Sequence, residues 1–323
     1  MSEASLIQID GFLTTRLRQS RHTPMLSVTP PFPSELMLEL TTGCNHACVF
    51  CKNPTMTRPQ KKMPFTVIES ILQQAYTLGA TKVGLSTTGD PFMFPHLADV
   101  VTLAKLCGYT YVYVSTNGAL ATPDKLKAVL DAGLDSLKFS INAGSRERYA
   151  EIHGHDEFAL VLQHLAWAVK YKAKTGKPAH LGVTYVQTKT NADEVAAFRE
   201  LLSPFVDEVY ISPCGVQSGY QLENIGALAE NPIPVDPPCP LLWNRVHVTA
   251  EGYLTLCCVD YQNYLAIEDL NRIPLAEAWH SVAFQEMRRK HLEHDLGTTL
   301  CGQCLSGKPQ HIEPLRHEWA TTI

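Results

Sequence analysis

Short apolar runs alternate with longer amphipathic segments between residues 35 and 212. Short runs rich in Val, Leu and Ile predict buried strands, whereas apolar positions spaced three and four apart predict helices with one buried face. The predicted strands are residues 35–40, 82–86, 110–115, 136–141, 180–187 and 208–212. The predicted helices between them are residues 65–78, 97–106, 123–130, 158–174 and 192–202.

This alternation predicts parallel βα units, because two neighbouring parallel strands need a crossover connection, which is usually a helix. Six such units make an incomplete barrel rather than the eight units of a closed one. The predicted fold class is therefore α/β, a partial (β/α)6 TIM-like barrel followed by a small cysteine-rich domain. In such barrels the functional groups lie on loops at the carboxyl ends of the strands.

The helix and strand periodicity is lost near residue 220, where proline becomes frequent. The predicted parts of the chain are an N-terminal lead-in (1–34), the barrel (35–219), a linker (220–238), the cysteine-rich module (239–305) and a C-terminal tail (306–323). Within the module we expect a hairpin of residues 245–249 and 253–257 and one helix of about residues 275–291.

Composition narrows the class of protein. Of the 323 residues, 45% are hydrophobic and 18% are charged, which suits a folded core and excludes a disordered or fibrous chain. A net charge of −5 gives no reason to expect nucleic acid as a partner. No apolar run is long enough to span a membrane, and the first thirty residues lack the apolar core of a signal peptide. We therefore expect a cytoplasmic protein.

Ten cysteines need a chemical explanation, because disulfide frameworks are rare in a reducing compartment. Seven fall into two groups spaced like metal ligands: Cys44, Cys48 and Cys51, then Cys239, Cys257, Cys301 and Cys304. The first group places three thiols within eight residues, on a loop that leaves a predicted strand. Three thiolates so close together can converge on one iron–sulfur cluster and leave one of its irons open. The alternatives are a zinc site, which usually needs a second pair of ligands, and a disulfide.

The Cys-x3-Cys-x2-Cys spacing, with Phe50 just before the last cysteine, resembles the signature of the radical S-adenosylmethionine (radical SAM) superfamily. The resemblance implies a [4Fe–4S] cluster whose open iron binds S-adenosylmethionine. It also implies that the reduced cluster splits this cofactor into a 5′-deoxyadenosyl radical. An external electron donor such as flavodoxin or ferredoxin is then expected as a partner.

Small polar residues follow the second, third and fourth predicted strands, where hydroxyl and amide groups can bind a zwitterion or a ribose. The segment Thr88-Gly89-Asp90-Pro91 resembles the family's Gly-Gly-Glu-Pro, which holds the methionyl amino group, although Asp90 is one methylene shorter than Glu. The resemblance implies that Asn117 and Ser140 contact the ribose and the carboxylate, and that Phe50 packs on the adenine. The full set of predicted cofactor contacts is Phe50, Thr88, Gly89, Asp90, Ser115, Asn117, Ser140 and Asn142.

Two charged side chains after the fourth strand, Arg146 and His153, are further candidates for a carboxylate or substrate contact. A position on the solvated face of a helix explains both residues equally well. We therefore leave their roles open.

The second cysteine group can fully ligate a further cluster, because it supplies four thiols. Its pattern, with Gly252, Asp260 and a terminal Cys-x2-Cys, resembles the twitch form of the SPASM auxiliary domain, which implies a second [4Fe–4S] cluster. A structural zinc is the alternative, since four cysteines also make a closed zinc site. The family pattern favours Cys257 over its neighbour Cys258 as the ligand.

Cys107, Cys214 and Cys258 remain outside both groups. A cysteine of this kind is often a small buried hydrophobe, which is our expectation for Cys107 on its helix. A thiol that faces the barrel mouth can instead donate a hydrogen atom, because S–H bonds are weak. Cys258 and Cys214 are the candidates for that role.

The leading functional hypothesis is a radical SAM enzyme that abstracts a substrate C–H hydrogen. Return of a hydrogen atom from Cys258 or Cys214 would give epimerisation, whereas electron transfer to the auxiliary cluster would give dehydrogenation. Residues 1–34 are too few for a leader-peptide-binding domain, which favours a sugar or aminocyclitol substrate over a peptide. A non-catalytic iron–sulfur or zinc protein is the hypothesis of a different class.

Overall fold

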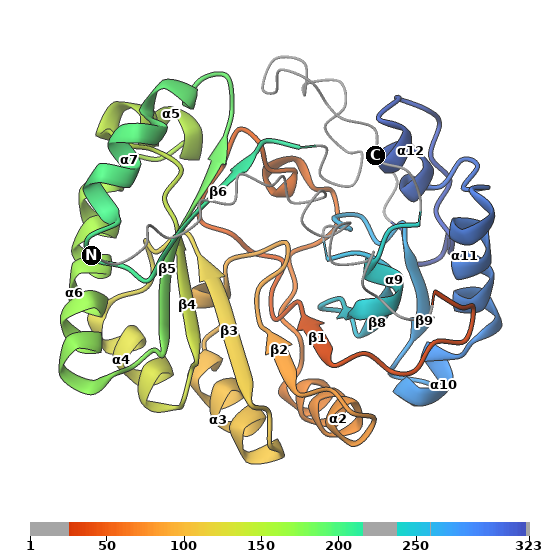
Figure 1. Cartoon of the computed structure of the whole chain (residues 1–323). Coiled ribbons are helices and arrows are strands. Elements are labelled where there is room, and N and C mark those ends of the chain that lie inside the picture. Colours follow the sequence, from red (N-terminus) through yellow and green to blue (C-terminus); the bar gives the residue numbers. More distant parts are fainter. Residues whose placement is uncertain (1–25, 216–237, 259, 321–323) are drawn as a thin grey trace.

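One nine-stranded sheet joins both halves of the chain in the computed structural model, which describes residues 26–215, 238–258 and 260–320. Its barrel strands are β1 (Glu35–Leu38), β2 (Lys82–Gly84), β3 (Tyr111–Thr116), β4 (Ser136–Ser140), β5 (His180–Gln187) and β6 (Glu208–Pro213). The module contributes β7 (Val246–Val248), β8 (Tyr253–Thr255) and β9 (Ala266–Asp269). The strand order is β6-β5-β4-β3-β2-β1-β7-β8-β9 (Figure 1).

The six barrel strands pair in parallel in sequence order, as the alternating pattern predicted. Helices connect them along the outer side of the curved sheet (Figure 1). They are α2 (Phe65–Thr77), α3 (Leu97–Cys107), α4 (Pro123–Asp131), α5 (Arg146–His153), α6 (Phe158–Thr175) and α7 (Val195–Leu202). The predicted fold class, an α/β partial barrel, is confirmed.

The apolar spacing places the helices on the sheet. In α2 the buried residues are Ile68, Ile71, Leu72 and Ala75, one face of a 3.6-residue period. Gly108 ends α3 in the left-handed region, with φ of 106°, where a glycine has no Cβ to strain the turn. The pattern therefore fixes both the buried face of α2 and the end of α3.

The module extends the barrel sheet from its β1 edge. Its strand β7 pairs in parallel with β1, so that Leu36 lies opposite Val246, and the predicted β7–β8 hairpin is antiparallel. Its helices are α9 (Leu241–Asn244), α10 (Leu275–Trp279), α11 (Val282–Glu293) and α12 (Leu300–Ser306). The module consequently lies against the strand that leads into the Cys44–Cys51 loop.

Several elements of the fold differ from the expectation. The single helix predicted over residues 275–291 is two helices, because Ser281 is extended and its hydroxyl caps α11 by accepting from the Phe284 amide at 3.2 Å. Helices α5, α9 and α12 and strand β9 were not predicted. All four are short and owe their stability to packing rather than to a long apolar period.

The end of the predicted lead-in is docked on the module. The Trp243 indole donates to the Ser27 carbonyl at 2.7 Å, and Phe32 packs edge-on against Trp279. The predicted linker, 220–238, lies outside the described residues except for Pro238. No helix of the described chain is long and apolar enough to cross a membrane.

Candidate functional site

Three thiols converge on the loop that follows β1. Cys44, Cys48 and Cys51 are half-buried free thiols, which excludes the disulfide alternative in this structure. Burial, followed by repulsion from the Cys51 and Cys44 thiolates, raises the pKa of Cys48 well above its usual value. Burial likewise raises the pKa of Cys44 to about 11. Thiols held this way become thiolates most readily when a metal cation neutralises them, so their chemistry fits a metal centre.

The residues after β2 hold this loop by backbone contact. The Asp90 amide donates to the Gly43 carbonyl at 2.9 Å. A Cβ at Gly89 would lie 2.3 Å from the Thr41 carbonyl oxygen, so no other residue fits there without movement of the loop. The Asn53 side-chain amide donates to the Thr42 carbonyl at 2.8 Å and to the Thr88 carbonyl at 2.9 Å. The segment predicted to bind S-adenosylmethionine is therefore packed directly on the cysteine loop.

The Asp90 carboxylate joins the ends of two strands. It accepts hydrogen bonds from the Phe92 amide at 2.9 Å and from the Thr116 hydroxyl and the Asn117 amide, both at 2.8 Å. Burial raises the pKa of Asp90, and these hydrogen bonds oppose the rise. A methionyl amino group bound here would meet a carboxylate that already accepts three hydrogen bonds from the protein.

The other predicted cofactor contacts divide into two groups. The Asn117 side-chain amide donates to the Asn45 side-chain oxygen at 2.9 Å and lies 3.8 Å from the Cys44 sulfur. The Asn142 side chain lies 3.2 Å from His153, which contacts the loop. By contrast, Ser140 on β4 accepts from Thr184 on β5 at 3.0 Å, and the Ser115 amide on β3 donates to Ser86, which follows β2, at 3.1 Å. These last two serines lie on β4 and β3, close to the carboxyl ends of the strands.

Two buried histidines, His46 and His153, contact each other beside Cys48 of the loop. His153 Nε2 lies 2.8 Å from the Ile141 carbonyl, so this nitrogen carries the proton and Nδ1 is the acceptor. That Nδ1 lies 3.4 Å from the Cys48 sulfur and 3.1 Å from His46 Nδ1. Burial lowers the pKa of His153 to about 3. His153 is thus neutral and buried rather than a solvated helix residue, whereas Arg146 pairs with Asp156 at the surface.

His46 was missed in the sequence, although it lies inside the cysteine motif. Its Nε2 lies 2.6 Å from a Glu157 carboxylate oxygen. One ligand atom each from His46, Cys48 and His153 lies within 4.8 Å of the other two, a set that can hold a single metal ion. A mononuclear site would therefore compete with the three-thiol site for Cys48.

Phe50 and Cys214 belong to the same corner of the site. With Ile152 they form a small buried apolar cluster, and Cys48 and Cys51 pack against its side. Cys214, which follows β6, therefore lies beside the first cysteine group. Cys107, in contrast, is half-buried on α3 and packs against the main core.

Arg58 fastens the loop to β1 and to the module. Arg58 is buried, with 3% of the residue exposed. Its guanidinium forms an ion pair with Glu39 and lies 3.5 Å from a Glu251 oxygen. The same Glu39 carboxylate accepts from the Thr88 hydroxyl and from the Ala250 amide. Burial raises the pKa of Glu39, and Arg58 opposes that rise. Neither residue was predicted, because a single Arg or Glu carries no sequence signal of its partner.

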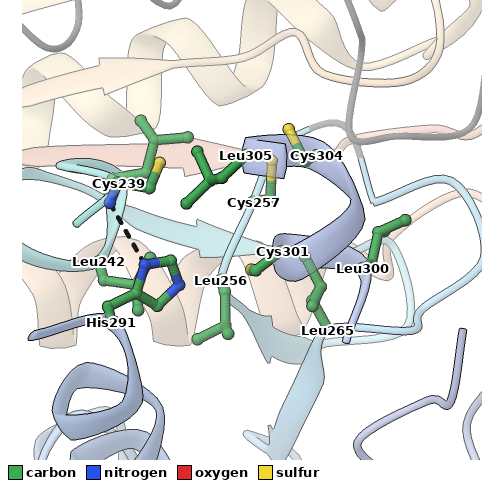
Figure 2. A pocket seen from close by; sticks show the side chains of 11 residues that line it. Cys239, Leu242, Leu256, Cys257, Leu265, His291, Leu300, Cys301, Cys304 and Leu305 are labelled. Atoms are coloured by element: carbon green, nitrogen blue, oxygen red, sulfur yellow. Dashed lines mark hydrogen bonds between the residues drawn. The ribbon is translucent and has the colours of Figure 1, made fainter. Parts of the chain in front are cut away.

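The second cysteine group lines one pocket. Cys239, Cys257, Cys301 and Cys304 surround it together with six leucines and His291 (Figure 2). The thiols come from the residues just before α9, from those just after β8 and from α12. The Cys239 amide donates to His291 at 3.3 Å. Burial, with repulsion from the Cys239 and Cys304 thiolates, raises the pKa of Cys301 well above its usual value. Four thiols around an apolar pocket fit a fully ligated metal centre.

A second pocket lies between the module and the barrel strand ends. Cys257 lines both pockets, whereas Cys258 lines only the second, together with Thr87 and Thr88 after β2. The second pocket is also lined by Glu39, His247, Val248, Thr249, Thr255 and Asp260. The adjacent cysteines therefore differ in surroundings, because Cys258 does not line the pocket that contains the other three cysteines.

Two family models match the chain. The model of the radical SAM superfamily matches residues 38–202, and that of SPASM, an iron–sulfur cluster-binding domain, matches residues 239–305. The first match covers just over half of the chain. The protein therefore belongs to the radical SAM superfamily and carries a C-terminal SPASM domain, which implies [4Fe–4S] clusters as its cofactors.

Curated relatives match over a part of their length. A tungsten-containing aldehyde ferredoxin oxidoreductase cofactor-modifying protein of Pyrococcus furiosus is 29% identical over 181 residues, 55% of this chain and 50% of that protein. A GTP 3′,8-cyclase of Chlorobaculum tepidum is 27% identical over 165 residues, 51% of this chain and 48% of that protein. The chain thus spans about half the length of these relatives.

Solved structures share the fold at low identity. SuiB of Streptococcus suis, bound to the precursor peptide SuiA, has a TM-score of 0.64 at 14% identity and covers 84% of this chain and 69% of its own. BtrN, in complex with AdoMet and 2-DOIA, has a TM-score of 0.56 at 16% identity, and the match covers 86% of this chain and 93% of the BtrN chain. The enzyme anSMEcpe with bound AdoMet has a TM-score of 0.60 at 14% identity and covers 85% of each chain.

Replacement of Gly89 by alanine is expected to push the Thr41–Gly43 backbone away from the strand ends, because the new Cβ would lie 2.3 Å from the Thr41 oxygen. We expect iron content after reconstitution to fall by about half, with loss of one cluster of two. Gly215→Ala is the matched control, since nothing lies within 4 Å of its Cβ position. Equal iron content in G89A and wild type would contradict the close packing.

Replacement of Arg58 by methionine leaves the buried Glu39 carboxylate without its cation. We expect the free energy of unfolding to fall by about 3 to 5 kcal/mol, the usual cost of breaking a buried pair on one side. Urea denaturation followed by circular dichroism measures it. Arg146→Met, which removes an exposed ion pair, is the control and should leave the unfolding midpoint unchanged.

Proposed function

We propose that Cys44, Cys48 and Cys51 hold a [4Fe–4S] cluster and leave one iron for S-adenosylmethionine. A reduced cluster bound there supplies the electron that splits the cofactor into methionine and a 5′-deoxyadenosyl radical. The observation that carries this proposal is the convergence of three free thiols on one loop at the carboxyl ends of the parallel strands. The family match supports the same assignment.

The chain's own part is to bind and orient the cofactor. We assign this to the residues at the ends of β2, β3 and β4 and to the aromatic residue of the motif, namely Phe50, Thr88, Gly89, Asp90, Ser115, Asn117, Ser140 and Asn142. Their common edge of the sheet and the packing of Gly89 on the cysteine loop support it. Asp90 would act through its backbone and through its carboxylate, whose two oxygens already accept three hydrogen bonds from the protein.

We propose that the four module thiols, Cys239, Cys257, Cys301 and Cys304, hold an auxiliary [4Fe–4S] cluster. Cys257 is preferred to Cys258 because only Cys257 lines the pocket that contains the other three. The match to an iron–sulfur cluster-binding domain over residues 239–305 favours a cluster over zinc.

The reaction that we propose is epimerisation of a carbon centre. The 5′-deoxyadenosyl radical takes the hydrogen atom of a substrate C–H bond and becomes 5′-deoxyadenosine. Cys258 then gives the hydrogen atom of its S–H bond to the opposite face of the substrate radical, which forms the epimer and a thiyl. One electron from flavodoxin or ferredoxin and one proton restore the thiol. The position of Cys258 beside Thr87 and Thr88 supports this role, and Cys214 beside Phe50 is the second candidate donor.

Dehydrogenation is the competing reaction. In it the substrate radical loses one electron to the auxiliary cluster and one proton to a base, which yields a carbonyl from an alcohol. Four thiols around one pocket favour this alternative, because they could hold an electron acceptor. As substrates we propose a sugar or aminocyclitol first, supported by the fold shared with BtrN, and a peptide second, supported by the fold shared with SuiB. The proposed compartment is the cytoplasm.

A non-catalytic metal protein is favoured by one observation, the His46, Cys48 and His153 set. A single zinc or iron there would remove Cys48 from the three-thiol site. Metal content separates the hypotheses, since the two clusters predict about eight irons per chain, whereas the mononuclear site predicts one metal ion in place of the four irons of the first cluster.

Reductive cleavage of S-adenosylmethionine tests the first proposal. Protein reconstituted with iron and sulfide, reduced with dithionite and mixed with S-adenosylmethionine should form 5′-deoxyadenosine, measured by liquid chromatography. Cys51→Ala should lower the rate to background, whereas Cys107→Ala, remote on α3, should keep it. Absence of the product in protein with full iron content would refute the proposal.

Solvent deuterium tests the fate of the substrate radical. With aminocyclitols and short peptides as a substrate panel in D2O, an epimerase should place one deuterium in the product, because the Cys258 thiol exchanges with solvent. C258A should still consume S-adenosylmethionine but form epimer only at background. If C214A alone abolishes deuterium incorporation, Cys214 is the donor. A product two mass units lighter without deuterium in both variants would instead establish dehydrogenation.

A further inference from the structure

A tyrosine of the module reaches the first cysteine group. The Tyr261 hydroxyl oxygen lies 3.4 Å from the Cys51 sulfur, and the tyrosine is 3% exposed. The Asn53 backbone amide lies 3.4 Å from the same sulfur. A phenol hydrogen is a donor and a thiolate sulfur is an acceptor, so this contact has the right polarity when Cys51 is a metal ligand.

The residues on both sides of Tyr261 are fixed to the cysteine loop. Gln262 donates to the Thr57 hydroxyl at 2.8 Å and accepts from the Arg58 amide at 3.2 Å. The Arg58 guanidinium donates to the Asn263 side-chain oxygen at 2.5 Å and to the Asp260 carbonyl at 3.3 Å. These contacts come before and after Tyr261 in the chain, so the ring is held in place against Cys51.

The turn that carries Tyr261 is itself rigid. The Asp260 carboxylate accepts from the Thr255 hydroxyl at 3.0 Å, the Tyr264 amide at 2.9 Å and the Leu265 amide at 2.8 Å. Asp260 is 2% exposed, so these hydrogen bonds are shielded from water. The phenol therefore reaches Cys51 from a preformed scaffold, and that scaffold begins only a few residues after Cys257.

We propose that Tyr261 is a positioning residue that donates its hydroxyl hydrogen to the Cys51 thiolate and raises the reduction potential of the first cluster. This inference rests on the proposed role of Cys51 as a cluster ligand. A reduced cluster carries one more negative charge than an oxidised one. A hydrogen bond to a ligand sulfur therefore stabilises the reduced form more, and hydrogen bonds to sulfur are among the factors that set cluster potentials.

This role makes the module a regulator of the first site. The three thiols of the first cysteine group all come from the barrel part of the chain, but the potential of a cluster there would depend on a side chain that the module supplies. A purely space-filling role for Tyr261 predicts that phenylalanine replaces it without consequence for the potential. The two roles therefore separate on one measurement.

The test is the midpoint potential of the first cluster in the reconstituted full chain, followed by electron paramagnetic resonance during redox titration. Tyr261→Phe should shift it to a more negative value and leave iron content unchanged. Tyr109→Phe is the matched control, because Tyr109 is also buried and donates to the Leu72 carbonyl at 3.0 Å, away from both cysteine groups. A background with Cys44, Cys48 and Cys51 all replaced by alanine retains the auxiliary site only, and Y261F should be silent there.

Site-specific 3,5-difluorotyrosine at position 261 tests the opposite direction. It keeps the ring and makes the hydroxyl a stronger donor, so the potential should become more positive than that of wild type. If Y261F fails to fold or to bind iron, this variant still decides the question. Unchanged potentials in both variants would overturn the inference while leaving the proposed function intact. Wild-type protein that binds no first cluster would instead overturn the proposed function.

Discussion

The structure depends on one buried cation, the Arg58 guanidinium, and on the Glu39 carboxylate that it pairs with. Two charges removed from water cost several kcal/mol each, so they persist only where the partners and the surrounding hydrogen bonds satisfy them. Here Glu39 directly follows β1, accepts from Thr88 after β2 and accepts from Ala250 of the module. One carboxylate therefore fixes the relative position of three segments that are far apart in the sequence.

The two cysteine groups place several thiols close together in buried surroundings. Burial raises the pKa of Cys48 and of Cys301 well above the usual value, so the thiolate form becomes favourable when a cation binds. Metal binding and folding are consequently coupled at both sites. The Arg58 and Glu39 pair supplies stability that does not depend on metal, because it holds the loop and the module together through hydrogen bonds of its own.

Much of the fold was predictable, because apolar periodicity reports directly which residues avoid water. The six parallel barrel strands and the β7–β8 hairpin follow from it. The break at Ser281 was missed because the apolar spacing runs through it, and only the side-chain cap marks the start of α11. The parallel pairing of β1 with β7 was also beyond the pattern, since register between distant strands leaves no local signal.

The sequence by itself predicted two metal sites, because the number and spacing of thiols decide what a short segment can ligate. For the second group, the preference for a cluster over zinc came from the family resemblance. The family match is consistent with that interpretation. Only the tertiary structure decided which groups surround those thiols. His46 and His153 lie next to Cys48, Cys214 lies beside Phe50, and Tyr261 approaches Cys51 across 210 positions of sequence. The Tyr261 contact depends on how the module docks on β1, whereas the other contacts depend on how the barrel elements pack. Packing of either kind leaves no local pattern in the sequence.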